Sequence, residues 1–169
     1  MRKAYVHYGQ SPDLYIANSS TVAQRIRDIY GKEAHVVNYP IDISQFQFSE
    51  EKDNYYLVSA RLLSYKKVDI IVEAFNRLGW NLLVMGKGPE MRRLKQGASD
   101  NIQFLGHVSD EKRRKLFARA KGVIVAALED YGLVPIEANA CGTPTITYGE
   151  GGVLDTQIPG KTGVFFEQQ

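Results

Sequence analysis

The chain has 169 residues and a formal net charge of +2, with 44% apolar and 24% charged residues. This length fits one domain with a core of its own, and the composition is that of an ordinary globular protein. The small net charge argues against nucleic acid as a partner. The single cysteine, Cys141, excludes an internal disulfide and fits a reducing compartment. No apolar run approaches the roughly 20 residues of a membrane-spanning helix.

Residues 1–50 contain two short strand-like runs on either side of a helical pattern. The helix is predicted to be capped at Ser19 or Ser20 and to stop at Gly31. The polar stretch that follows, Ser49-Glu50-Glu51-Lys52-Asp53-Asn54, looks like a surface connection. We therefore predict a single domain, in which residues 1–50 are a lead-in segment that packs on a compact unit of residues 51–169.

In residues 51–169, apolar runs alternate with helical patterns. Strands are predicted at residues 55–58, 82–85, 102–105, 123–127, 144–147 and 164–166. Helices are predicted between them, one of which begins at Pro89 and another at Ser109. Strands buried on both sides and joined by helical crossovers imply an α/β fold of the Rossmann-like type, an open parallel sheet with helices on both faces. Ligands of such folds bind outside the carboxyl ends of the strands.

The most informative motif is the stretch from Glu129 to Glu137. Glu129 ends a predicted strand, a glycine turn follows, and a helix then begins with Pro135 in its first turn. Both carboxylates can therefore face one crevice, with the free backbone N–H groups of the helix N-terminus between them as a phosphate seat. Two acceptors for hydroxyl groups beside such a seat suit a nucleotide sugar. The alternative is a solvated loop acid followed by a surface helix acid.

Arg61 and Lys66 lie in the loop between the strand at residues 55–58 and the next helix. Two cations in such a loop can clamp a diphosphate, with arginine as a fork and lysine as a point charge. The alternative is an exposed loop with routine basic residues. A denser basic run, Lys112-Arg113-Arg114-Lys115, is interpreted as the solvent-exposed face of a helix. Contact with a membrane surface is kept as an alternative.

Two glycine motifs are superficially similar to nucleotide-binding loops. Gly86-Lys87-Gly88-Pro89-Glu90 lacks the third glycine of a dinucleotide fingerprint, so it is interpreted as a tight turn. Gly160-Lys161-Thr162 lacks the upstream glycine of a P-loop, because residue 155 is an aspartate. His107 is interpreted as an ordinary loop histidine, although backbone groups beside it could meet a base. Nothing is spaced like a metal site, so we expect no metal ion.

Together these motifs make the chain resemble the C-terminal, donor-binding domain of family 4 retaining glycosyltransferases, which are built from two Rossmann-like domains. The resemblance covers nearly the whole chain. It is carried by Asn18-Ser19, Pro40-Ile41-Asp42 with Phe46, Arg61 to Lys66, Gly86 to Glu90, Phe104-Leu105-Gly106, Glu129 to Glu137, Glu137 to Pro144, and Gly160 to Gly163. Within the family, Lys66-Lys67-Val68-Asp69 looks most like mannosyltransferases of polysaccharide or O-antigen assembly.

The resemblance implies a role for each matching residue. Arg61 and Lys66 would hold the donor diphosphate. Glu129 would contact hydroxyl groups of the sugar, and Glu137 those of the ribose. The remaining donor contacts would come from backbone N–H groups of Gly132, Leu133 and Val134 at the phosphates and from Val108 at the base. The family usually has glycine where this chain has Ala60, which puts close phosphate approach at that point in doubt.

The reaction implied is transfer of mannose from GDP-mannose to a glycan or lipid-linked acceptor, with retention of configuration and without a cofactor. Arg61, Lys66 and the helix N-terminus would stabilise the charge that develops on the diphosphate, and Glu129 would complete the catalytic set. The acceptor side lies in a separate N-terminal domain in this family, so we expect residues 1–169 alone to be inactive. A cytoplasmic enzyme is expected, with the inner face of the membrane as an alternative site. A non-catalytic Rossmann-like binding module and half of a sugar-nucleotide epimerase are the competing interpretations.

Overall fold

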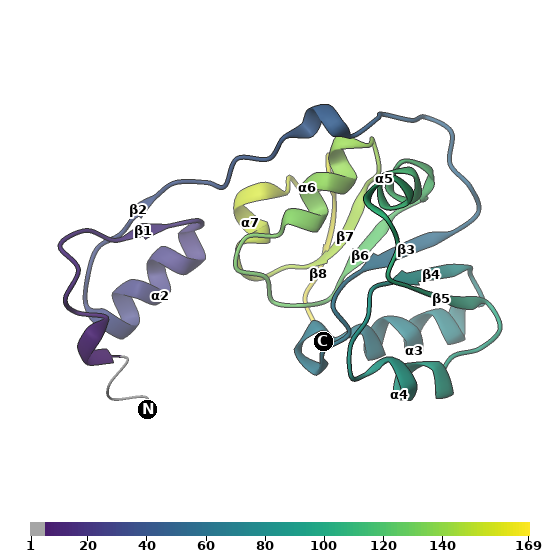
Figure 1. Cartoon of the computed structure of the whole chain (residues 1–169), viewed down its shortest axis with the longest axis horizontal. Helices are drawn as coiled ribbons and strands as arrows, with labels where there is room; N and C mark the ends of the chain where they lie inside the picture. The colour runs from purple at the N-terminus through teal and green to yellow at the C-terminus, as the bar shows by residue number, and fades with distance from the viewer. Residues whose placement is uncertain (1–5) are drawn as a thin grey trace.

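The computed structural model describes residues 6–169 (Figure 1). Its main feature is a six-stranded sheet, parallel throughout, in the order β5-β4-β3-β6-β7-β8. The strands are β3 (Tyr56–Ser59), β4 (Leu82–Met85), β5 (Ile102–Gly106), β6 (Val123–Val125), β7 (Thr145–Tyr148) and β8 (Gly163–Phe166). The predicted fold class, an α/β protein with an open parallel sheet, is confirmed.

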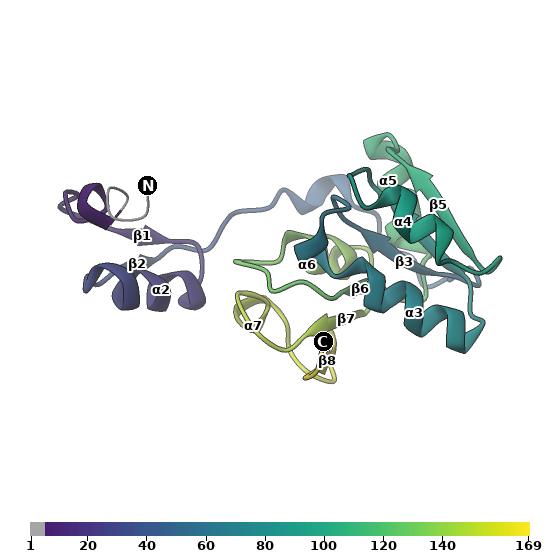
Figure 2. The same ribbon diagram turned by 90° about the horizontal axis from the view of Figure 1, so that it is seen from below.

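Helices cover both faces of this sheet (Figure 2). They are α3 (Val68–Leu78), α4 (Met91–Gln96), α5 (Asp110–Arg119), α6 (Leu133–Ala140) and the short α7 (Val153–Thr156). The two-residue alternation of β3 divides the core between the faces. Leu57 lies in the core with Phe117 of α5, whereas Val58 lies in the core with Phe75 of α3. Residues of α4 pack with α3, and residues of α6 pack with α5.

The strand order reverses at β3. From β3 the chain moves outward through β4 and β5, and it then returns to place β6 on the other side of β3. Loops after β3 and β6 therefore leave the sheet in opposite directions, which opens a crevice at their carboxyl ends. This is the position at which the open α/β folds bind ligands.

The N-terminal residues form a separate small unit (Figure 1). In it, β1 (Ile16–Ala17) and β2 (His35–Val36) make a two-stranded parallel sheet, and α2 (Ser20–Tyr30) connects the two strands. The predicted caps are confirmed, because the Ser19 hydroxyl accepts a hydrogen bond from the N–H of Val22 and Gly31 ends the helix at a φ of 63°. A long connection with one 3-10 turn, η1 (Ile43–Gln45), leads from this unit to β3.

The small unit contacts the main unit at the loop that follows β6. The Ser19 hydroxyl donates to the carbonyl of Asp130 at 2.5 Å, and Arg25 pairs with the Asp130 carboxylate at 2.8 Å. The Tyr131 hydroxyl donates to the carbonyl of Tyr39 at 3.2 Å. Ser20 also binds the Asp155 carboxylate of α7 through its backbone N–H at 2.5 Å. The N-terminal residues thus contact the main unit beside the crevice.

Two element boundaries differ from the prediction by two residues. The helix expected to begin at Pro89 begins at Met91, because the N–H of Glu90 donates to the carbonyl of Leu62 and the residues before Met91 form a turn. Strand β6 ends at Val125, where its pairing with β7 stops, two residues earlier than expected. Within residues 6–169, no helix is both long and apolar enough to cross a membrane.

Candidate functional site

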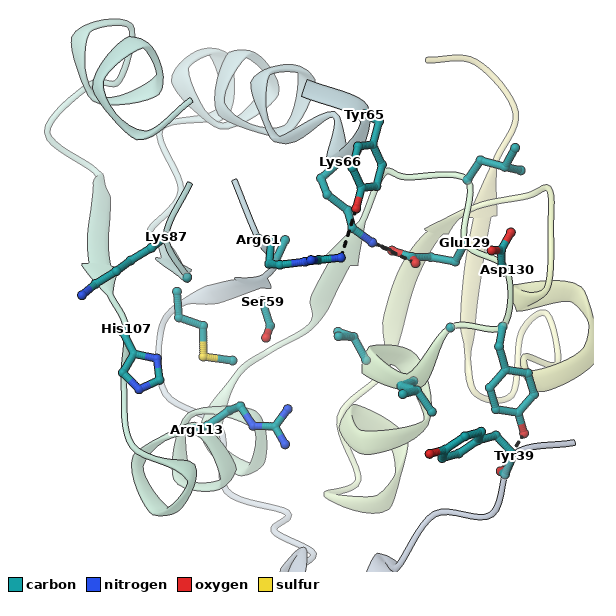
Figure 3. A pocket seen from close by; sticks show the side chains of 18 of the residues that line it. Tyr39, Ser59, Arg61, Tyr65, Lys66, Lys87, His107, Arg113, Glu129 and Asp130 are labelled. Carbon is teal, nitrogen blue, oxygen red and sulfur yellow. Dashed lines mark hydrogen bonds and ion pairs between the residues drawn. The ribbon is translucent and has the colours of Figure 1, made fainter. Parts of the chain in front are cut away.

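A cavity of about 1270 Å³ opens at the carboxyl ends of the central strands (Figure 3). Its walls come from the loops after β3, β4, β5 and β6, from the start of α6, and from Asn18 and Tyr39 of the N-terminal residues. Seven of the eight predicted donor-binding residues line it: Arg61, Lys66, Val108, Glu129, Gly132, Leu133 and Val134. Glu137 is not among the lining residues. Seven of the predicted residues therefore lie together at one cavity, and their proposed roles remain predictions.

The loop after β3 brings both predicted cations to the cavity. Lys66 ends a 3-10 turn, η2 (Ser64–Lys66), and Lys67 follows in the left-handed region at a φ of 53°. A residue other than glycine pays about 1–2 kcal/mol for that conformation. Arg61 donates to the Tyr65 hydroxyl at 3.4 Å and forms no ion pair with any residue in the range 6–169. Its guanidinium is exposed and faces the cavity (Figure 3).

Lys66 and Glu129 form an ion pair inside the cavity (Figure 3). The Lys66 Nζ atom lies 2.7 Å from one carboxylate oxygen of Glu129 and 2.9 Å from the other. The two side chains are only 17% and 23% exposed, so solvent screens this pair less than a surface pair. Lys66, predicted to bind the diphosphate, and Glu129, predicted to bind the sugar, therefore neutralise each other's charge in the structure.

Close backbone approach explains the glycine turn after β4. Gly86 has a φ of 125°, and a Cβ atom there would lie 1.8 Å from the carbonyl oxygen of Ala60. A Cβ on Gly88 would lie 2.2 Å from the carbonyl oxygen of Leu62, whose N–H donates to the carbonyl of Lys87. The two glycines therefore let the loops after β3 and β4 run side by side, which holds Arg61 at the cavity. The predicted tight turn is confirmed, and Ala60 has a negative φ that does not need glycine.

The start of α6 supplies a place for an anion. Gly132 precedes the helix at a φ of 91°, and no side chain caps the free N–H groups of the first turn. A Cβ on Gly132 would lie 2.9 Å from the Val153 side chain, so this position has room only for glycine. Gly132, Leu133 and Val134 all line the cavity. The positive end of the helix dipole and its free N–H groups therefore face the same space as Arg61 and Lys66.

The other glutamate of the motif is held by a residue that the sequence interpretation did not select. Both carboxylate oxygens of Glu137 accept hydrogen bonds from Arg113, at 2.7 and 3.0 Å. Arg113 lines the cavity, and Glu137 lies behind it with a side chain that is 14% exposed. The expectation that both carboxylates of the motif line one crevice is thus met by Glu129 only.

The basic run of residues 112–115 was interpreted as a solvent-exposed helix face. This is wrong for Arg113, whose side chain is 29% exposed and turned toward α6. The sequence spacing between Arg113 and Phe117 could have predicted this orientation. Arg113 precedes the fully buried Phe117 by four residues, so both lie on the same face of α5. His107, interpreted as an ordinary loop histidine, also lines the cavity, on the β5 side (Figure 3).

No cluster of three or more histidine, cysteine or acidic side chains that could hold a metal ion occurs among residues 6–169. Cys141 is buried, and burial raises the pKa of its thiol. Its side chain lies in the core behind the cavity with Phe117 and Ala138. The charged groups that line the cavity are the cations Arg61, Lys66, Lys87 and Arg113 and the carboxylates Asp110, Glu129 and Asp130, beside the N-terminus of α6.

These features place the chain in a known class. Residues 41–169 match the family model described as "Glycosyl transferases group 1", and the chain belongs to this family. A glycogen synthase of Mycobacterium tuberculosis is 28% identical to this chain over 170 residues, covering 90% of this chain and 41% of that protein. A probable sucrose-phosphate synthase of Thermosipho melanesiensis is 28% identical over 140 residues, which are 74% of this chain and 32% of that protein. The chain thus spans less than half the length of these curated relatives.

Solved structures show the same fold. The HepE protein of Anabaena, solved in complex with UDP-glucose, has a TM-score of 0.86 at 20% identity and matches 98% of this chain, which covers 53% of that protein. A sucrose-phosphate synthase of Thermosynechococcus elongatus has a TM-score of 0.84 at 22% identity, with 97% of this chain and 47% of that chain covered. The predicted resemblance to a glycosyltransferase domain is confirmed at the level of family and fold.

Proposed function

We propose that the cavity binds the nucleotide-sugar donor of a retaining glycosyltransferase. One observation carries this proposal: Arg61, Lys66, Glu129 and the N-terminus of α6 converge on one cavity at the point where the strand order reverses. Two cations and free N–H groups suit a diphosphate, and a carboxylate beside them suits sugar hydroxyl groups. The family to which the chain belongs supports this assignment.

The proposed mechanism is electrostatic. Cleavage of the bond between sugar and nucleotide leaves negative charge on the diphosphate. Arg61, Lys66 and the N-terminus of α6 stabilise that charge as it develops, and they need little rearrangement because the fold already holds them in place. Glu129 orients the sugar through its hydroxyl groups. Leaving-group stabilisation by these residues needs no cofactor and no metal ion.

Two donors are proposed, each from a different observation. GDP-mannose follows from the resemblance of Lys66-Lys67-Val68-Asp69 to mannosyltransferases of polysaccharide assembly. In the structure only Lys66 of this stretch lines the cavity, and Asp69 pairs with Arg93 at 3.3 Å on the surface. UDP-glucose is the second candidate, because the structural neighbour HepE was solved with it. A glycan or a lipid-linked sugar is the proposed acceptor.

The partner that completes the enzyme is proposed to be an acceptor-binding domain of the same polypeptide. The chain covers about half of the HepE chain, which leaves room in such proteins for a second domain. We propose a cytoplasmic enzyme. Contact with the inner face of a membrane through Lys112, Arg114 and Lys115 is the alternative, since these basic residues lie beside Arg113 on α5 but do not line the cavity.

Isothermal calorimetry tests the binding proposal. UDP, GDP, UDP-glucose and GDP-mannose are titrated into the wild-type chain and into the Arg61→Ala variant, with Lys95→Ala as control because Lys95 is an exposed cation on α4. Binding of at least one nucleotide sugar that is weakened only by Arg61→Ala supports the proposal. Lack of binding by all four ligands contradicts it. With the full-length protein, transfer of the sugar to an acceptor distinguishes a transferase from a sugar-nucleotide epimerase or a binding module.

A further inference from the structure

Arg113 occupies the boundary between the cavity and Glu137. Its guanidinium lines the cavity, whereas Glu137 is not a lining residue. The Nη1 atom lies 2.7 Å from one carboxylate oxygen of Glu137, and the Nη2 atom lies 3.0 Å from the other. Such a bidentate pair fixes the plane of the carboxylate as well as its position. Any ligand that approaches Glu137 from the cavity therefore meets a carboxylate whose orientation Arg113 has set.

Neighbouring contacts hold the Arg113 side chain in turn. Its guanidinium carbon lies 5.7 Å from the centre of the Phe117 ring, and Phe117 is fully buried. The Nε atom is buried and has no hydrogen-bond partner, and the Asp110 carboxylate lies 3.8 Å from it. Both hydrogen bonds of the pair come from the Nη atoms, and each of these keeps one further N–H group.

The pair leaves part of the Glu137 carboxylate available. An ionised carboxylate has about four lone-pair sites, and Arg113 takes one on each oxygen. Each oxygen therefore keeps one free site, and both sites lie in the plane that Arg113 fixes. A carboxylate held in this way can accept a hydrogen bond from a ribose hydroxyl group without losing further rotational freedom. A carboxylate that rotates freely lacks this advantage, because each bond it forms must first restrict its rotation.

We propose that Arg113 is a positioning residue that makes the site specific for ribonucleotides by orienting Glu137 toward the ribose hydroxyl groups. The inference rests on the proposed function, because it assumes that a nucleotide binds in the cavity. It adds a role that the sequence motifs do not contain, since Arg113 belongs to the basic run of α5 and not to the stretch from Glu129 to Glu137. The conservative replacement by lysine keeps the charge but not the fork, so it tests orientation separately from charge.

The test compares each ribonucleotide with its 2′-deoxy counterpart. Dissociation constants of UDP, 2′-deoxy-UDP, GDP and 2′-deoxy-GDP are measured by calorimetry for the wild type, Arg113→Leu and Arg113→Lys. Lys112→Leu is the matched control, because it removes the same charge from the neighbouring, exposed position of α5. The wild type and the control should bind the ribonucleotide at least about tenfold more tightly, as expected for a hydrogen bond to a charged group.

In Arg113→Leu this ratio should fall to about twofold or less, and in Arg113→Lys it should lie between the two. A variant in which both ligands weaken equally, with the wild-type ratio kept, overturns the inference because that pattern is one of general structural damage. A wild type that does not distinguish the two sugars overturns it as well. If Arg113→Leu fails to fold, the Arg113→Lys variant decides: an affinity ratio between ribonucleotide and 2′-deoxynucleotide equal to that of the wild type overturns the inference. If no nucleotide binds the wild type, the proposed function fails and this inference fails with it.

Discussion

Lys66 and Glu129 neutralise each other inside the cavity, with the Lys66 Nζ atom 2.7 and 2.9 Å from the two carboxylate oxygens. A diphosphate that enters must share the ammonium group with this carboxylate. The pair therefore reduces the net attraction that Lys66 offers to a free nucleotide. It also holds Lys66 in place before the donor arrives. Arg61, which has no such partner in the described residues, offers its full charge.

The first prediction concerns the two cations. Arg61→Ala should weaken nucleotide diphosphates by about tenfold, because a hydrogen bond to a charged partner is worth about 1.5–3 kcal/mol. Lys66→Ala should weaken them more, since it removes one cation and also leaves the Glu129 carboxylate without a counter-charge beside the phosphates. Calorimetry with UDP and GDP measures both effects. The double variant Lys66→Ala with Glu129→Gln should regain part of the loss. Unchanged affinity in both single variants would remove the diphosphate assignment.

A second prediction separates the two glutamates. Glu129→Gln should leave the affinity for free UDP or GDP unchanged or higher, because Lys66 is released, and should weaken the nucleotide sugar. Glu137→Gln should weaken the free nucleotide and the nucleotide sugar alike, because both carry the ribose. Dissociation constants for the two ligand types in each variant test this. The opposite pattern, or equal losses for all ligands, would show that the two roles are wrongly assigned.

Much of the fold could be predicted because short stretches of the sequence determine the local secondary structure. Strands β4 and β6 are continuous apolar runs, and Ser19 and Gly31 mark both ends of α2 by their capping chemistry. Arg61, Lys66 and Glu129 could be placed at the cavity for one reason. They follow predicted strands, and the carboxyl ends of parallel strands meet at one edge of a sheet.

The parts of the fold and of the candidate site that could not be predicted depend on contacts between residues that are distant in the sequence. Glu137 is separated from the cavity by Arg113, which is 24 positions earlier in the chain and on another helix. The two short strands of the N-terminal unit were predicted, but their pairing in a sheet of their own was not, because it joins residues 16–17 to residues 35–36. Gly86 carried a turn signal, but its closeness to Ala60 depends on how two loops run past each other.

The third prediction tests that close approach. Gly86→Ala should destabilise the protein by more than Gly79→Ala, although both glycines have a positive φ. At Gly79 a methyl group would meet nothing within 4 Å, so only the backbone conformation costs energy, about 1–2 kcal/mol. At Gly86 the methyl group would also clash with the carbonyl of Ala60, which adds about 1–3 kcal/mol. Urea unfolding measures the difference, and equal losses for the two variants would contradict the close contact.

The fourth prediction concerns stability at alkaline pH. Burial, followed by the negative charge of Asp53, raises the pKa of Tyr55 to about 12, and its hydroxyl donates to the carbonyl of Leu116 at 3.0 Å. A raised folded-state pKa means that the folded protein keeps this proton longer than the unfolded chain does. The stability that Tyr55 contributes is therefore fully present below pH 10 and is lost as the pH rises toward 12.

Tyr55→Phe removes this titration, so the free energy of unfolding should fall less steeply between pH 10 and pH 12 than in the wild type. Urea titrations at several pH values in that range measure the slope. Tyr8→Phe, which removes the hydroxyl of a side chain that is 73% exposed, is the control. The same slope in Tyr55→Phe and in the wild type would show that Tyr55 does not titrate differently in the two states.

The last prediction is that residues 1–169 bind a donor but transfer no sugar. Rate in such a reaction comes from holding donor and acceptor together in a reactive geometry, in a site from which water is excluded. The roles proposed for Arg61, Lys66, Glu129 and Glu137 are all on the donor side, and the chain spans about half of the structural neighbour HepE. A longer protein that contains the acceptor side should transfer the sugar with retention, and Glu129→Ala should abolish the transfer. Radiolabelled donor and a glycan acceptor, assayed with both proteins, decide the matter. Transfer by residues 1–169 alone would show that this chain carries an acceptor site of its own.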